Sequence, residues 1–217
     1  IGKVVAAQLY YNGGGGSGKK PAVEDDEFRI RHHFQYLALS GGVLNDQAIH
    51  VIDVCRAVLE TNPLYAFGQS SAAGRKFEYG DTHTNYQVIY KYPNDVNVAV
   101  QQMSVGSTSG GVCARFFGEL GTAEANYSGG VFITGPNKWD SGNNNALSDA
   151  DALKGKSFID SIVSGKYINQ IEAGCNSTLA AIMGREACYS GKKVTWKDMV
   201  SGKQRYGDQP DLKQFLK

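Results

Sequence analysis

The hydrophobic period of the sequence changes twice along the chain, and this limits the possible folds more than any other feature. Apolar residues recur at helical spacing over residues 24–60, alternate with polar residues over residues 85–105, and return to helical spacing near the C-terminus. The alternating segments are joined by short turns rather than by helices. Helices at both ends and strands in the middle are typical of the α+β class, in which helices pack on one face of an antiparallel sheet.

The alternating segments predict the strands of that sheet. Residues 85–92 alternate, Pro93, Asn94 and Asp95 form a turn, and residues 97–105 alternate again, which predicts a β-hairpin. Further strands are expected over residues 3–11, 112–119, 122–128 and 130–135. The sequence therefore predicts an open, mainly antiparallel sheet of about six strands, with helices on one face.

The segments with helical spacing lie on either side of these strands. They are residues 24–39, 43–60, 157–165 and 176–191. Acidic residues at the start of the first segment suit the helix dipole, and Gly165 and Gly191 are typical residues at a helix C-terminus.

The charge balance and the lengths of the apolar runs argue against two classes of protein. The chain has 22 Lys and Arg against 21 Asp and Glu, and this net charge of +1 does not favour nucleic-acid binding. No apolar run approaches the roughly 20 residues of a membrane helix. Residue 1 is isoleucine and no leader sequence follows, so the chain is expected to be a fragment or a processed form, and its compartment is left unassigned.

Residues 13–20 match the spacing of a phosphate-binding loop, but their chemistry argues against that function. The last position of the motif needs a Ser or Thr hydroxyl for Mg²⁺, and the sequence has Lys20 there. An acidic run begins at Glu24, close to where a phosphate group would need the N-terminus of a helix. The segment is expected to be a mobile surface loop or a lid over an active site.

Asp46, His50 and Asp53 have the spacing of residues on one side of a helix. A hydrogen bond between Asp46 and His50 would fix the imidazole tautomer and raise its basicity, so that His50 could accept a proton from a substrate hydroxyl. Two alternatives fit the same residues, namely a surface ion pair and a metal site with one histidine and two carboxylates. His83 is the isolated histidine that could contribute to such a metal site.

Two further groups of residues allow both a structural and a functional interpretation. Arg29 and Arg31, with the two histidines that follow, form either a solvated helix face or part of a binding pocket. In the strand over residues 85–92, the tyrosines alternate with Gln87, Ile89 and Lys91, which leaves a mixed face opposite the predicted core. That face could form an oligomer interface.

Four stretches of the sequence together resemble the glucose–fructose oxidoreductase / inositol dehydrogenase / MocA family. GGVLNDQAIHVIDVCRAVL resembles the first helix of the family's C-terminal domain, and YGDTHTNYQVIYKYPNDV resembles its "GD, strand, YPNGV, strand" stretch. FFGELGTAEA resembles its "GT.G" turn, and NSTLAAIMGREACYSGKKVTWKDM is similar to the closing segment of a bacterial subgroup. The stretches occur in the family's order over nearly the whole chain.

The resemblance implies a protein of two domains, of which residues 1–217 are the C-terminal substrate-binding and oligomerisation domain. The family's N-terminal Rossmann domain binds NAD or NADP and precedes a Glu-Lys-Pro motif with a catalytic lysine. That motif does not occur in this sequence, which also lacks the βαβ alternation of a dinucleotide site. This chain alone is therefore expected to bind no cofactor and to be inactive.

The resemblance also implies roles for individual residues. The family's Asp-x-x-x-His motif falls on Asp46 and His50, with His50 as the acid and base toward the substrate hydroxyl and Asp46 as its orienting partner. Arg29 and Arg31 fall where the family's pocket wall is expected. His83 lies in a stretch that departs from the family pattern, so it either influences the choice of substrate or belongs only to the turn.

These observations predict part of an NAD(P)-dependent oxidoreductase that acts on a hydroxyl of a sugar, polyol or glycoside and forms homo-oligomers through the open sheet face. Neither nucleic acid nor a membrane is an expected partner, and no metal ligands are assigned. Two alternatives stay open: a non-catalytic module that self-associates, and a metal-dependent lyase or hydrolase built on Asp46 and His50.

Overall fold

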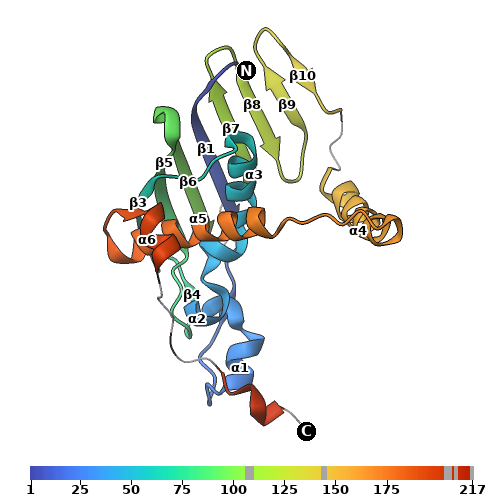
Figure 1. Cartoon of the computed structure of the whole chain (residues 1–217). Coiled ribbons are helices and arrows are strands. Elements are labelled where there is room, and N and C mark those ends of the chain that lie inside the picture. Colours follow the sequence, from blue (N-terminus) through green and yellow to red (C-terminus); the bar gives the residue numbers. More distant parts are fainter. Residues whose placement is uncertain (106–109, 143–145, 203–206, 208–209, 216–217) are drawn as a thin grey trace.

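The fold is built on one large β-sheet with two helices against one of its faces (Figure 1). It is a computed structural model, which describes residues 1–105, 110–142, 146–202, 207 and 210–215. The helices on the sheet are α3 (Ile49–Leu59), which contacts β1 and β7, and α5 (Ile171–Ser190), which contacts β3 and β5. This arrangement confirms the predicted α+β class.

The strands of the large sheet alternate between early and late segments of the chain. From one edge to the other they are β10 (Trp139–Asp140), β9 (Val131–Thr134), β8 (Thr122–Asn126), β7 (Gly111–Gly118), β1 (Val4–Gly13), β6 (Asn97–Ser104), β5 (Asn85–Lys91), β3 (Tyr65–Ser71) and β11 (Val194–Thr195). A separate parallel pair joins β2 (Ser17–Gly18) to β4 (Lys76–Phe77).

The predicted number of about six strands was wrong, because the sheet has nine strands, and the sheet is mixed rather than purely antiparallel. The predicted strands are all present, and β3, β10 and β11 are added to them. β1 lies in the middle of the sheet, where it pairs in parallel with β6 and antiparallel with β7. A short turn joins only antiparallel neighbours, so reasoning from turns could not find the parallel pairing of two strands that are distant in sequence.

The core lies between the sheet and the two helices. Tyr86, Val88 and Tyr90 alternate along β5 and are buried toward the helices. The hydroxyl of Tyr90 donates a hydrogen bond to the carbonyl of Ala180 in α5 at 2.8 Å. A Cβ at Gly184 would lie 2.0 Å from that hydroxyl, so the close packing of α5 on β5 requires glycine at this position.

The remaining helices differ from the predicted helices in their bounds more than α3 and α5 do. They are α1 (Asp26–Arg31), α2 (Leu37–Ser40), α4 (Ala146–Ser164) and α6 (Trp196–Ser201), with 3₁₀ turns at His33–Gln35, Pro93–Asp95 and Leu212–Phe215 and a π-helical turn at Leu44–Ala48. The helix predicted over residues 24–39 is broken into α1, a 3₁₀ turn and α2. Tertiary contacts cause the break: the Asp81 carboxylate accepts a hydrogen bond from the Leu37 backbone N–H at 2.7 Å and starts α2 there.

Helix α4 lies apart from the sheet (Figure 1). It begins before the predicted residue 157 and leaves several large apolar side chains exposed, among them Phe158, Ile162 and Val163. In the part of the chain that the structure describes, no helix combines the length and the apolar composition needed to span a membrane.

Candidate functional site

The predicted acid–base pair lies where a π-helical turn joins α3. The turn spans Leu44–Ala48 and so contains Asp46, while His50 lies in the first turn of α3. A π-turn holds more residues than an α-turn, which changes the angle between residues four apart. Within the described residues no hydrogen bond joins the two side chains, and they interact through their charges instead.

The carboxyl group of Asp46 is half-buried and lies near two imidazoles. Burial raises its pKa, while the charges of His33 and His50 act in the opposite direction. Because the folded state favours the protonated acid, the contribution of this group to stability is present at low pH and is lost as the pH rises through its raised pKa. Ionisation of this carboxyl group therefore costs stability, which is common for functional groups.

Two tyrosine rings contact the imidazole of His50. The Tyr11 ring, at the end of β1, is stacked with its centroid 6.1 Å from that of His50. The Tyr127 ring, which follows β8, lies at 5.5 Å. Burial, with Tyr127 and Asp46 nearby, raises the pKa of Tyr11, so its hydroxyl stays protonated at neutral pH and can donate a hydrogen bond. Sequence reasoning missed both tyrosines, because neither shares a periodic pattern with His50.

A small polar cavity of about 160 Å³ lies beside the π-turn. Its lining includes Gln47 next to Asp46, Ser104 at the end of β6, and the segment Thr82, His83 and Thr84 before β5. Phe34, Val43 and Phe77 add apolar walls, and none of the described residues that line it is a carboxylate, lysine or arginine. This size suits a molecule of a few heavy atoms or one end of a larger one, and its lining favours neutral groups that form hydrogen bonds.

The glycine-rich segment forms part of this cavity. Gly14 and Gly16 line it, and a Cβ at Gly15 would lie 2.1 Å from the Ser104 carbonyl oxygen, so the backbone passes directly over the end of β6. Ser17 and Gly18 then pair with β4. The segment is thus held against the cavity. Of the two expectations for this segment, this position fits a lid over a site better than a mobile surface loop.

The five predicted site residues do not all lie together. His83 lines the small cavity, and Asp46 and His50 lie on the adjoining turn and helix. Arg31 is exposed and pairs with Glu27 on the surface of α1 at 2.7 Å.

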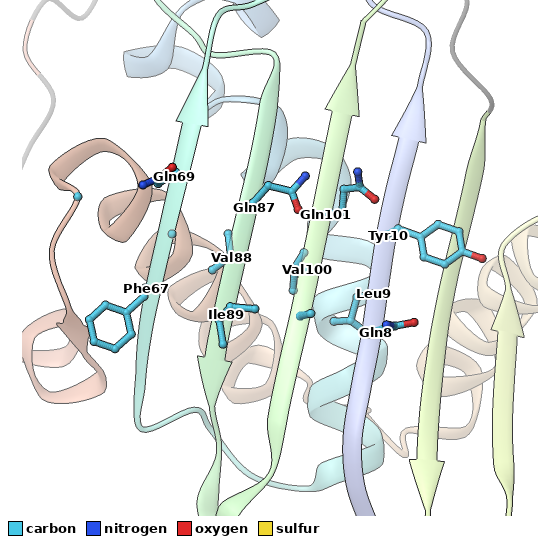
Figure 2. Close-up of a pocket in the computed structure, with 13 residues that line it drawn as sticks. Gln8, Leu9, Tyr10, Phe67, Gln69, Gln87, Val88, Ile89, Val100 and Gln101 are labelled. Carbon is cyan, nitrogen blue, oxygen red and sulfur yellow. The ribbon is translucent and has the colours of Figure 1, made fainter.

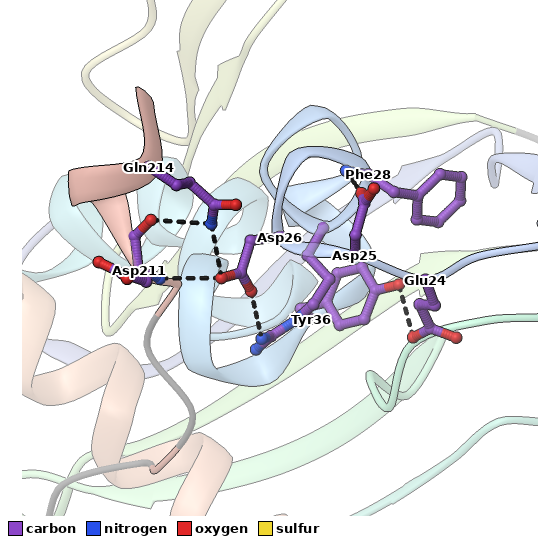
Figure 3. A network of polar contacts seen from close by, with 8 residues as sticks. Glu24, Asp25, Asp26, Phe28, Tyr36, Asp211 and Gln214 are labelled. Atoms are coloured by element: carbon purple, nitrogen blue, oxygen red, sulfur yellow. Dashed lines mark hydrogen bonds and ion pairs between the residues drawn. The ribbon is translucent and has the colours of Figure 1, made fainter. Parts of the chain in front are cut away.

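Asp26 lies in a polar network between α1 and the C-terminal segment (Figure 3), and Arg29 is its ion-pair partner. Its guanidinium pairs with Asp26 at 3.1 Å and lies over the Tyr36 ring. The same Asp26 carboxylate accepts hydrogen bonds from the Asp211 backbone and from the side chain of Gln214. These contacts explain the position of Arg29 without a substrate.

Rather than the small cavity, His50 itself lines a wider cleft of about 570 Å³ between α3, β8 and α5. Asp53 and Ser177 line it and are joined by a hydrogen bond, and Ser177 accepts another from Arg56 at 3.1 Å. Asp53 therefore ties α3 to α5. Among the described residues, no three His, Cys, Asp or Glu side chains form a group that could hold a metal ion.

One comparison with known proteins identifies a family. The family model described as "GFO/IDH/MocA C-terminal domain" matches residues 1–124. Curated proteins, in contrast, give no match to this chain.

Solved structures share the fold over most of the chain. Levoglucosan dehydrogenase in complex with NADH and levoglucosan has a TM-score of 0.70 at 13% identity, over 90% of this chain and 59% of that one. Myo-inositol 2-dehydrogenase from Lactobacillus plantarum has a TM-score of 0.64 at 17% identity, over 90% and 57%. Aldose-aldose oxidoreductase from Caulobacter crescentus, complexed with glycerol, has a TM-score of 0.61 at 16% identity, over 90% and 56%. The chain thus spans less than two thirds of the length of these structures.

Proposed function

This chain belongs to the GFO/IDH/MocA C-terminal domain family, and from that premise we propose that it is the substrate-binding half of an NAD- or NADP-dependent oxidoreductase acting on a sugar, polyol or glycoside hydroxyl. The observation that carries the proposal is the position of Asp46. Its half-buried carboxylate lies near the imidazoles of His33 and His50 and next to a cavity lined by neutral polar groups. A polyhydroxylated substrate suits such a lining, because each hydroxyl can both donate and accept a hydrogen bond.

In the proposed reaction His50 takes the proton of the substrate hydroxyl as general base. Asp46 stabilises the imidazolium that forms, through the charge interaction described above. The protonated hydroxyl of Tyr11, stacked beside His50, can donate a hydrogen bond to the reacting oxygen. The nicotinamide cofactor supplies the hydride acceptor.

The described residues do not form a dinucleotide site of their own. A Rossmann site needs a parallel sheet with a glycine-rich turn between a strand and a helix, and the glycine-rich segment after β1 leads to β2 rather than to a helix. We therefore assign cofactor binding to a separate N-terminal domain that acts with residues 1–217. Hydride transfer requires both the substrate site and the bound cofactor, so this chain alone is expected to be inactive.

The test is an assay of the native protein, that is, residues 1–217 together with the proposed N-terminal domain. It is assayed with NAD⁺ and NADP⁺ against a panel of sugars and polyols that includes levoglucosan, myo-inositol and glucose. We expect cofactor reduction, measured at 340 nm, with at least one of them, and none with residues 1–217 alone. If the native protein is folded and reduces neither cofactor with any member of the panel, the proposed function is wrong.

The open face of the sheet supports a second part of the proposal, namely assembly of identical chains. A groove of about 590 Å³ crosses this face, and the side chains of Gln69, Gln87 and Gln101 form a row over three neighbouring strands (Figure 2). Beside the row, Phe67 and Ile89 are 47% and 50% exposed. Apolar groups among amides that both donate and accept hydrogen bonds suit an interface between two identical surfaces.

Replacing Ile89 with lysine is expected to dissociate this assembly, because it would bury a charge in the interface. The mass of the particle, measured by light scattering, should fall toward that of one protomer. Val58→Lys is the matched control, since Val58 is 48% exposed but lies on α3, on the other side of the sheet. An unchanged mass in Ile89→Lys, or an equal loss in Val58→Lys, would show that the open face is not the interface.

A further inference from the structure

His83 is held by residues that lie far from it in the sequence. Its side chain is half-buried and lines the small polar cavity. Ser70 at the end of β3 contacts one ring nitrogen, and Tyr189 in α5 contacts both the ring and the backbone. Tyr189 lies beyond residues 1–124, which the family model matches. The family model therefore does not cover the contact between Tyr189 and His83.

Ser70 determines which nitrogen of His83 carries the proton. Its Oγ lies 2.7 Å from Nδ1 of His83 and also contacts the thiol of Cys188. A hydroxyl has one proton to donate, and an imidazole nitrogen is a stronger acceptor than sulfur. A Ser70 hydroxyl that donates to Nδ1 leaves the proton of a neutral imidazole on Nε2. The described residues provide no hydrogen-bond partner for that nitrogen.

Tyr189 fixes the orientation of the ring. The two rings are stacked with centroids 4.4 Å apart and planes 10° from parallel. The Tyr189 hydroxyl accepts a hydrogen bond from the His83 backbone N–H at 3.1 Å and lies 3.2 Å from the hydroxyl of Tyr86, whose side chain is buried. The Tyr189 side chain thus holds both the ring and the backbone of His83, and Tyr189 is itself held by a contact with the buried Tyr86.

The surroundings of His83 favour its neutral form. Burial and the positive charge of Arg75 lower its pKa, against the smaller opposing effect of Asp81. The other titratable groups that face it, Tyr86, Tyr189 and Cys188, all have raised pKa values and are neutral near pH 7. A neutral imidazole with a free Nε2–H is a hydrogen-bond donor of fixed direction.

We propose that Ser70 and Tyr189 are positioning residues that hold the Nε2–H of His83 toward the cavity, where it donates a hydrogen bond to an oxygen atom of the substrate. This inference rests on the proposed function and makes it more specific. His83 is separate from the His50 pair, so the oxygen that it binds is not the reacting one. The site then selects sugars or polyols with a second hydroxyl or a ring oxygen at that position, over analogues that lack it.

The tautomer can be measured on residues 1–217 directly, because the chain has only four histidines. Long-range ¹H–¹⁵N spectra, assigned with a His83→Gln variant, should show His83 as the neutral Nε2–H form at pH 7. Ser70→Ala should convert part of it to the Nδ1–H form. Ser71→Ala is the matched control on the same strand and should leave the spectrum unchanged. An Nδ1–H tautomer in the unmodified chain would overturn the inference.

The effect on the substrate is measured with the native protein and its best substrate from the panel. His83→Gln and Tyr189→Leu should each raise KM by about 3- to 10-fold, the loss of one hydrogen bond, with a smaller change in kcat. Tyr189→Phe keeps the stacked ring and serves if Tyr189→Leu does not fold; it should raise KM less than His83→Gln. An unchanged KM in His83→Gln overturns the inference while the proposed function stands. If no substrate is turned over, the proposed function fails. The tautomer measurement then decides separately whether Ser70 positions the proton of His83.

Discussion

Replacing His50 with asparagine in the native protein is expected to lower kcat by about 10²- to 10⁴-fold, the usual contribution of a general base. Asparagine keeps a polar group of similar size but cannot accept the proton of the substrate hydroxyl. The ring lies on the surface of α3, against Tyr11 and Tyr127, rather than in the core. KM and the thermal unfolding temperature should therefore change little, and steady-state kinetics with a melting curve would test both.

Asp53→Asn is the matched control for this experiment. Asp53 lies one turn after His50 on the same helix, and its carboxylate accepts a hydrogen bond from Ser177 of α5. Its loss should lower the melting temperature and leave kcat nearly unchanged. A kcat that falls equally in both variants would show that the effect of His50→Asn comes from disturbance of α3, and His50 would lose its role as the base.

Replacing Gly184 with alanine is expected to cause a large loss of stability, about 2–5 kcal/mol. The added Cβ would lie 2.0 Å from the hydroxyl of Tyr90, whose side chain is fully enclosed. Either α5 moves away from the sheet, or Tyr90 gives up its hydrogen bond to the carbonyl of Ala180. For a chain of this size the melting temperature should fall by about 5–15 °C.

Gly174→Ala in the same helix is expected to have the opposite effect, a gain in stability. No atom lies within 4 Å of a Cβ built at Gly174. The gain in helix propensity should then raise the free energy of unfolding by about 0.5–1 kcal/mol. If both variants melt at the temperature of the unmodified protein, α5 does not pack on β5 as closely as the structure has it.

The strands were predictable where the sequence alternates and where a turn is marked. The β5–β6 hairpin is an example, since Tyr86, Val88 and Tyr90 alternate up to the turn at Pro93. β3 was missed because its sequence, YAFGQSS, contains a glycine and small polar residues. β10 and β11 have two residues each, which is too short to carry a pattern.

The candidate site was predictable only where its residues are neighbours in the sequence. Asp46 and His50 were found from a spacing of four, although that spacing does not reveal the π-turn. Tyr127 and Tyr189 reach the site from segments far along the chain, where no local spacing relates them to a histidine. Arg31 was proposed from the expected position of the family's pocket wall, but its charge is paired with Glu27 on the same helix.

The central position of β1 has a consequence for how the protein folds. This strand is synthesised before its two neighbours, β6 and β7, which begin roughly 90 or more residues later. The middle of the sheet therefore cannot close until β6 and β7 have also left the ribosome. Contacts between such distant segments make folding slow, and they leave an apolar edge unprotected in the nascent chain during that interval.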